Sequence, residues 1–182
     1  MTDIRFTNIL QLDDAIKEKV REWRNSGRVR HFMLTQHVIS AHEHTKWVDG
    51  LKRGDNALFW VVFAGDDPIG AAYLHNINKE KKTSEWGFYI GNDAYTGKGL
   101  GKNILFKLLE TSFDEMGFEV LLTKAFSDNI AALSLYRKFD FAEKGREALD
   151  GKRDVILLEF TKDDWSKVRG KLSSEPYSEN RQ

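Results

Sequence analysis

The sequence predicts an α+β domain in which helices flank a mixed, mostly antiparallel central sheet, with the element order β-α-α-β-β-β-α-β-α-β-β. Three observations lead to this prediction. Residues 56–90 contain three apolar runs separated by short polar turns, as in an antiparallel meander. A glycine-rich stretch then opens an amphipathic segment over residues 98–116, which indicates a crossover helix. Strand-like and helix-like segments alternate after it.

The chain begins with a strand, a helix and an irregular segment. Residues 4–9 are the first expected strand. Residues 12–25 are the first expected helix, because acidic residues occupy its first turn and apolar residues recur at helical spacing. Residues 28–39 are mixed in character and predict a short helix followed by a loop.

A second helix is expected over residues 41–52. Ser40 precedes it and Glu43 follows three positions later, which is the signature of a capping box. Its buried stripe is expected to consist of Trp47, Val48 and Leu51.

The middle of the chain predicts three consecutive strands. The apolar run over residues 56–63 is the first, and the turn at 65–68 joins it to residues 69–76 as a hairpin. A charged turn at residues 79–82 leads into an aromatic strand over residues 83–90.

The C-terminal half supplies the remaining elements. In order they are the helix over 98–116, a strand over 118–126, a short helix over 129–138 capped by Asp128, strands near 142–147 and over 153–160 joined at Asp150-Gly151, and a short helix around 162–169. From residue 171 the chain is polar and without periodicity, so we expect one domain over residues 1–170 and a disordered tail over 171–182.

Composition narrows the class of protein. Lysine plus arginine and aspartate plus glutamate both number 28, so the zero net charge offers no electrostatic case for nucleic-acid binding. The chain has no cysteine, which excludes disulfides and a thiol nucleophile. No apolar run is as long as a membrane span, and the N-terminus lacks a signal-peptide pattern. We therefore expect a cytoplasmic protein that does not bind membranes.

The glycine-rich stretch, residues 96–101, predicts an anion site. A strand that runs through glycines into a helix presents unpaired N–H groups and the positive end of the helix dipole. Gly97, Gly99 and Gly101 would let the backbone approach a diphosphate closely. The stretch is not a P-loop, because no Gly-Lys-Ser/Thr follows a four-residue spacer.

Together with a second segment, this loop resembles the GNAT superfamily of acyl-CoA-dependent N-acetyltransferases. Residues 96–101 read TGKGLG and resemble the family's pyrophosphate loop, usually Q/R-x-x-G-x-G/A. Residues 129–141 read NIAALSLYRKFDF and resemble its second motif, N-x-x-A-x-x-L-Y-x-x-x-G-F. Thr96 stands where Gln or Arg is usual, and Asp140 where Gly is usual; neither change removes a backbone donor.

The resemblance implies the cofactor and the catalytic groups. Acetyl-CoA would be the co-substrate, bound by Phe88, Tyr89, Ile90, Gly97, Lys98, Gly99, Leu100, Gly101, Lys102, Asn129 and Tyr136. Tyr136 would protonate the departing thiolate, because a phenol stays protonated until a strong base appears. Glu85 is the expected base, directly or through water, since family members often carry a carboxylate on this strand; His75 is the second choice.

The N-terminal third resembles, more narrowly, the acetyltransferases of pseudaminic acid biosynthesis. They acetylate UDP-4-amino-4,6-dideoxy-N-acetyl-altrosamine, a precursor for flagellin glycosylation. The matching residues begin with Trp23-Arg24-Asn25 and continue to Trp47. This resemblance implies a small-molecule acceptor, a UDP-amino sugar. Its expected contacts are Arg24, Arg30, Met33, Thr35, His37 and Tyr95, with the arginines suited to a diphosphate.

Other functions stay open at this stage. A similar N-terminal helix occurs in ribosomal-protein and peptide N-terminal acetyltransferases, and a CoA-binding sensor without turnover is a non-enzyme alternative. Four of the five histidines cluster, but no i, i+4 pair exists, so we expect no metal. A homodimer is compatible with the family.

Overall fold

The computed structural model describes residues 3–149, 151 and 153–174, without the side chains of 171–174. Its strands are β1 (Ile4–Asn8), β2 (Leu58–Ala64), β3 (Asp67–Asn78), β4 (Thr83–Ile90), β5 (Val120–Phe126), β6 (Ala142–Leu149) and β7 (Arg153–Thr161). Its α-helices are α1 (Asp14–Asn25), α2 (Gly27–Arg30), α3 (Ala41–Arg53), α4 (Leu100–Glu110), α5 (Ile130–Lys138) and α6 (Lys162–Ser174).

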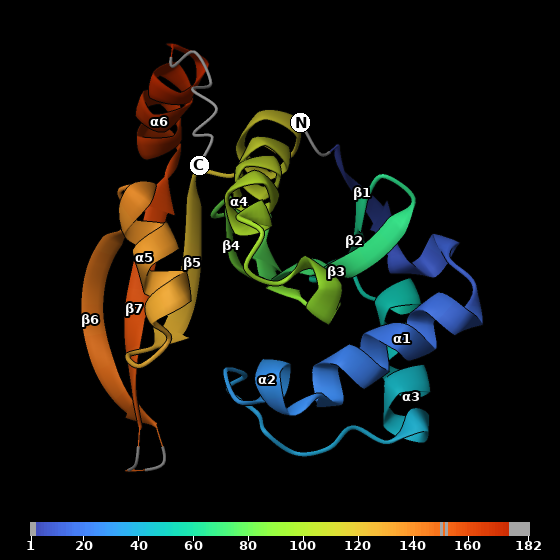
Figure 1. Ribbon diagram of the computed structural model, residues 1–182. Coiled ribbons are helices and arrows are strands. Elements are labelled where there is room, and N and C mark those ends of the chain that lie inside the picture. The colour runs from blue at the N-terminus through green and yellow to red at the C-terminus, as the bar shows by residue number, and fades with distance from the viewer. Residues whose placement is uncertain (1–2, 150, 152, 175–182) are drawn as a thin grey trace.

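The strands form one seven-stranded sheet in the order β1-β2-β3-β4-β5-β7-β6 (Figure 1). Every neighbouring pair is antiparallel except β4 and β5, which are parallel and joined by the α4 crossover. The predicted fold class and the predicted meander are therefore confirmed. The expected order of elements is also confirmed, with α2 as the short helix and α6 at the end.

The sheet separates two cores. On one face α4, α5 and α6 pack against the sheet through residues such as Ile104, Leu133 and Trp165. On the other face α1, α2 and α3 cover the first strands through Val20, Val29 and Val48. Figure 1 shows α4 and α1 on opposite sides of the β1–β4 half. The apolar faces of the helices thus pack against opposite faces of the sheet.

The predicted capping box of α3 is confirmed: Glu43 N–H donates to Ser40 Oγ, and Ser40 N–H donates to the Glu43 carboxylate. The expected buried stripe is partly wrong. Trp47 is 37% exposed, whereas His44, one turn earlier, is 7% exposed and packs toward the sheet. Trp47 instead rests edge-on against Phe59 of β2, with ring centroids 4.8 Å apart.

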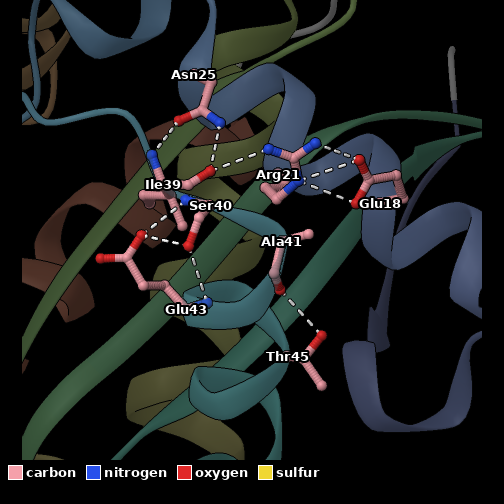
Figure 2. A network of polar contacts seen from close by, with 8 residues as sticks. All are labelled: Glu18, Arg21, Asn25, Ile39, Ser40, Ala41, Glu43 and Thr45. Atoms are coloured by element: carbon pink, nitrogen blue, oxygen red, sulfur yellow. Dashed lines mark hydrogen bonds and ion pairs between the residues drawn. The ribbon is translucent and has the colours of Figure 1, made fainter.

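The loop over residues 31–40 is anchored to α1 (Figure 2). The Asn25 side chain donates to Ile39 O and accepts from Ile39 N–H, both at 2.8 Å. Arg21 Nη1 donates to the same carbonyl at 3.0 Å, while its guanidinium pairs with Glu18. The Ile39 backbone therefore makes three hydrogen bonds to side chains of α1, which hold the end of the loop against the helix.

Several boundaries differ from expectation. The helix expected over 98–116 is α4 followed by a π-helical turn, Thr111–Glu115. Asn129, not Asp128, caps α5, because its side chain accepts from Ala132 N–H while Asp128 pairs with Arg153. The tail was expected over residues 171–182, but helix α6 continues to Ser174 and includes residues 171–174. Residues 175–182 lie outside the described residues, as do Asp150 and Lys152 of the hairpin turn.

Asp140 explains how the second motif tolerates the loss of its usual glycine. Its φ is +60°, in the left-handed region that glycine adopts freely and that aspartate tolerates better than most residues. The turn between α5 and β6 is therefore kept. No helix among the described residues has the length and apolar character needed to cross a membrane.

Candidate active site

The sheet splits between β4 and β5. The two strands pair only at their beginnings, from Thr83 opposite Val120 to Glu85 opposite Leu122. At the next position the Thr123 hydroxyl donates to Trp86 O at 3.0 Å, so a side chain replaces the backbone partner. Beyond this point, the β4 edge facing β5 has no strand partner among the described residues. Because strand backbone groups alternate in direction, Phe88 and Ile90 face the split as Trp86 does.

A cavity of about 460 Å³ occupies the split, and we call it the cofactor groove. It is lined by Trp86 to Ile90 of β4, by Thr123 to Ala125 of β5, and by α5 residues including Tyr136. Helix α2 lies across its end, because Arg28 Nη1 donates to Ile90 O at 3.0 Å. The carbonyl of Ile90 thus already has a partner, which leaves Phe88 as the freer of these two backbone positions.

The glycine loop meets the mouth of this groove. Gly97 and Gly99 both have φ of +74°, a backbone conformation that residues other than glycine rarely adopt. Gly99 is the N-cap of α4. Within the described chain, nothing accepts a hydrogen bond from the N–H groups of residues 97–99. The first turn of α4 adds its own unpaired donors. The predicted anion-binding geometry is therefore present at the groove.

Tyr136 lines the groove from α5 and is buried, with 7% exposure. Its ring is held between Trp86, at 5.4 Å between centroids, and Phe141, at 5.3 Å. Burial raises the pKa of the Tyr136 phenol, which keeps its proton in place at neutral pH. Its hydroxyl has no hydrogen-bond partner in the described part of the chain. The side chain therefore presents a protonated hydroxyl, without a partner in the described chain, to the groove.

A second cavity of about 300 Å³ lies on the face covered by α1 and α3, and we call it the acceptor cavity. It shares Met33, Tyr73, His75 and Tyr89 with the cofactor groove. The two cavities therefore meet at these residues. We call the place where the two cavities adjoin, at these shared side chains, the junction.

Tyr73 forms much of the junction and was not predicted from the sequence. A Cβ built on Gly87, its cross-strand neighbour on β4, would lie 2.4 Å from the Tyr73 hydroxyl. The phenol thus occupies the space above the glycine. Its ring stacks on Phe59 at 5.8 Å with planes 2° apart. Only a pairing register, which the sequence does not reveal, could have identified this contact.

Arg24 lines the acceptor cavity and has no carboxylate partner among the residues that the structure describes. Its Nη2 donates to Thr35 O at 2.6 Å and to Thr35 Oγ1 at 3.1 Å. Its Nη1 is buried and has no partner among the described residues. Burial lowers the pKa of the Arg24 guanidinium. A partly desolvated cation that lines a cavity and has no carboxylate partner in the described chain is suited to bind an anionic group.

The predicted base lies at the vertex of the split. Glu85 is the last β4 residue paired with β5 and lines the cofactor groove. His75 faces it across the strands, with Nε2 3.9 Å from Glu85 Oε2. His75 also lines the acceptor cavity, which Glu85 does not. Both candidate bases therefore lie close to the junction.

The other expected contacts divide into two groups. Met33 and Thr35 line the acceptor cavity. Arg30, His37 and Tyr95 line neither cavity. Tyr95 instead bonds Asp67 beside the glycine loop, with Lys98 over its ring at 5.1 Å.

The remaining predicted cofactor contacts and the histidines are placed as follows. Asn129 lines the cofactor groove and uses its side-chain oxygen to cap α5. Lys98 and Lys102 are exposed beside the glycine loop. His37 lies 3.7 Å from Glu43, and His44 packs against Trp47. No three His, Cys, Asp or Glu side chains gather into a metal-binding group within the residues described.

Comparison with known proteins agrees with this geometry. Residues 7–142 match the family model described as Acetyltransferase (GNAT) domain. Over 138 residues the chain is 28% identical to acetyltransferase PseH of Campylobacter jejuni, an alignment that covers 76% of this chain and 84% of that protein.

Two solved structures share the fold. Spermidine N-acetyltransferase from Vibrio cholerae, in complex with CoA and spermine, superposes with a TM-score of 0.81 at 18% identity, over 90% of this chain and 98% of the other. Campylobacter jejuni N-acetyltransferase PseH in complex with acetyl coenzyme A gives 0.68 at 20% identity, over 87% and 99%. Identities this low establish the fold alone.

Proposed function

The chain belongs to the GNAT acetyltransferase family, and we propose that it acetylates the 4-amino group of a UDP-linked amino-deoxysugar with acetyl-CoA. Acetyl transfer follows from the family. The acceptor is the proposal, and the sequence similarity to PseH supports it. The reaction would then belong to pseudaminic acid biosynthesis in the cytoplasm, upstream of flagellin glycosylation.

The observation that carries this proposal is the Arg24 guanidinium, which lines the acceptor cavity and, within the described residues, is bonded only to Thr35. None of the described residues lining that cavity is an aspartate or a glutamate. A polyamine acceptor requires carboxylates around its ammonium groups, because an unpaired buried charge is costly. An acceptor that carries phosphate satisfies Arg24 instead. The aromatic rings of Trp47, Phe59 and Tyr73 offer an apolar wall for a deoxysugar.

The proposed reaction is direct attack of the acceptor amine on the thioester. The neutral amine bonds to the carbonyl carbon, its proton passes to the His75–Glu85 side of the junction, and the C–S bond breaks. Tyr136 gives its phenolic proton to the departing thiolate. The backbone N–H of Phe88, which faces the split, is suited to polarise the thioester carbonyl oxygen. Holding both substrates at the junction supplies the entropic part of the rate enhancement.

The residues present suit the co-substrate. The N–H groups of residues 97–99 and the first turn of α4 are suited to the pyrophosphate. The exposed β4 edge at Phe88 can pair with the pantetheine amides like an added strand. Lys98 and Lys102 add positive charge near the phosphates, and Asn129 borders the same groove.

Two alternatives differ in measurable ways. A peptide N-terminal acetyltransferase would turn over peptides and would not be inhibited by UDP. A CoA-binding sensor would bind CoA without acetylating any amine. The presence of Tyr136 at the groove and of His75 and Glu85 at the junction favours an enzyme.

Inhibition by UDP tests the proposed acceptor class. UDP without the sugar should compete with the acceptor but not with acetyl-CoA, because its diphosphate would occupy Arg24. Spermidine should neither serve as acceptor nor compete. Competition by spermidine, together with indifference to UDP, would contradict the proposal.

A further inference from the structure

The connection between β3 and β4 carries an irregularity directly beside the candidate base. The regular register of β3 and β4 is lost after His75 and resumes only at Asn78 opposite Thr83. Asn76 within this gap has φ of +50°, a left-handed conformation that is rare outside glycine and is tolerated by asparagine. Such bulges commonly re-aim side chains next to active sites.

The bulge is held in place by a buried side chain. The hydroxyl of Ser84, 1% exposed on the adjacent strand, lies 3.0 Å from His75 O and 2.9 Å from Glu85 O, and its single proton can be donated to either. This hydroxyl offers the His75 carbonyl a hydrogen-bond donor where the regular strand pairing is lost. A buried donor therefore supports the irregular backbone at this point of the sheet.

The bulge brings the Asn76 side chain onto Glu85. Asn76 Nδ2 donates to Glu85 Oε1 at 2.9 Å. The other carboxylate oxygen, Oε2, then faces His75 Nε2 at 3.9 Å, a distance that an imidazolium would shorten. The three side chains form a row, Asn76–Glu85–His75. Only the last of them borders the acceptor cavity.

We propose that His75 is the group that accepts the proton of the acceptor amine, that Glu85 stabilises the resulting imidazolium, and that Asn76 is a positioning residue that orients Glu85. This inference rests on the proposed direct transfer. The proton leaves the amine nitrogen as the C–N bond forms and binds an imidazole nitrogen. It then passes to solvent, since the His75 and Glu85 side chains are 43% and 34% exposed.

The other titratable or charged groups that line the two cavities are each buried or paired. The other titratable or charged groups of the two cavities are Arg24, Arg28, His44, Tyr73, Tyr89, Lys124 and Tyr136. Burial raises the pKa of the three tyrosines, which stay neutral, and burial lowers the pKa of His44. Lys124 is paired with Glu147, and Arg28 with Asp93.

The test is the pH dependence of kcat/KM for the acceptor in Asn76→Gly and Asn76→Asp. Glycine keeps the left-handed backbone and removes the amide, so Glu85 loses its orientation. The acidic limb of the profile, where kcat/KM falls as the base is protonated, then moves to lower pH. Aspartate adds a negative charge that favours the imidazolium, and the limb moves to higher pH. The expected loss of rate at neutral pH for Asn76→Gly is about tenfold.

Matched variants complete the experiment. His75→Gln should abolish the limb and lower kcat about a hundredfold. Lys82→Gly is the control, because Lys82 is also left-handed, with φ of +52°, in the same β3–β4 connection and lines neither cavity. Its profile should match the wild type. An upward shift in Asn76→Gly would mean that Glu85 alone is the base, and a retained limb in His75→Gln would also overturn the proposal.

A second readout separates this inference from the acceptor assignment. The kinetic test uses whichever amine is turned over, so failure of the sugar assignment leaves it intact. The ring-proton titration of His75 by NMR needs no turnover. Its midpoint should fall in both Glu85→Gln and Asn76→Gly relative to the wild type. Equal midpoints in all three proteins would refute the proposed coupling of Asn76, Glu85 and His75.

Discussion

Replacing Arg24 by methionine should weaken acceptor binding while leaving the fold as stable as before, or more stable. In the wild type the guanidinium is about half buried, has no carboxylate partner and leaves Nη1 without an acceptor in the described chain. Within the part of the chain that the structure describes, its hydrogen bonds go only to Thr35. Methionine has a similar length and fills the same space without a charge.

The two expected effects have opposite signs. Folding loses the bonds to Thr35, about 1 kcal/mol each, and regains about 1–3 kcal/mol from a buried donor that is no longer unsatisfied, so the sum lies near zero. Acceptor binding loses a charge-assisted bond of about 1.5–3 kcal/mol. This corresponds to a rise in acceptor KM of about 10- to 150-fold.

The assay combines thermal unfolding with steady-state kinetics on the UDP-amino sugar. Arg53→Met is the matched control, because Arg53 is an exposed residue at the end of α3 that lines neither cavity. It should change neither quantity. A loss of more than about 2 kcal/mol of stability in Arg24→Met, with unchanged acceptor KM, would show that Arg24 is structural and would refute the reasoning.

Three further substitutions give distinct results. Tyr136→Phe should lower kcat by about 10²- to 10⁴-fold with little change in acetyl-CoA affinity, measured by single turnover and by CoA titration; an unchanged kcat would exclude the phenol as the acid. Asn25→Ala removes both bonds to Ile39, so the acceptor KM should rise and hydrogen exchange of residues 31–40 should quicken, while acetyl-CoA KM stays constant. Gly87→Ala places a methyl group 2.4 Å from the Tyr73 hydroxyl and should cost about 1–3 kcal/mol of unfolding free energy and most of the activity. Wild-type melting of this variant would mean that Tyr73 can move freely.

Local rules account for what the sequence predicted well. The capping box at Ser40 fixed the start of α3, and the strand over residues 83–90 matches β4 at both ends. The glycine loop was recognised because glycines between a strand and a helix N-terminus favour an anion site, and Gly97 and Gly99 are left-handed in the structure. Each of these signals depends on a few neighbouring residues.

The acceptor side depends on contacts between distant segments. Trp47 was expected in the core because it lies at helical spacing, yet it lies at the rim of the acceptor cavity, and His44 is buried instead. Arg30 and Arg24 looked equivalent as phosphate ligands, but only Arg24 lines the cavity. Helical spacing specifies a face, and only the packing of α1 and α3 on the sheet decides which side chains reach a cavity.

The bulge at Asn76 and the contact between Tyr73 and Gly87 could not be predicted for the same reason. Asn76 gives no local signal of a bulge, because asparagine is common in ordinary turns. The Tyr73–Gly87 contact exists only once β3 and β4 adopt their register. These tertiary features lie at the junction of the two cavities, where the proposed chemistry takes place.

The most direct test of the proposed function is CoA release in a mixture of equal concentrations of the UDP-4-amino sugar, spermidine and an N-terminal peptide, followed by mass analysis of the products. We predict that the acetyl group appears on the sugar nucleotide and that Tyr136→Phe slows its appearance at least a hundredfold. Acetylation of spermidine or of the peptide in preference to the sugar would contradict the proposed acceptor.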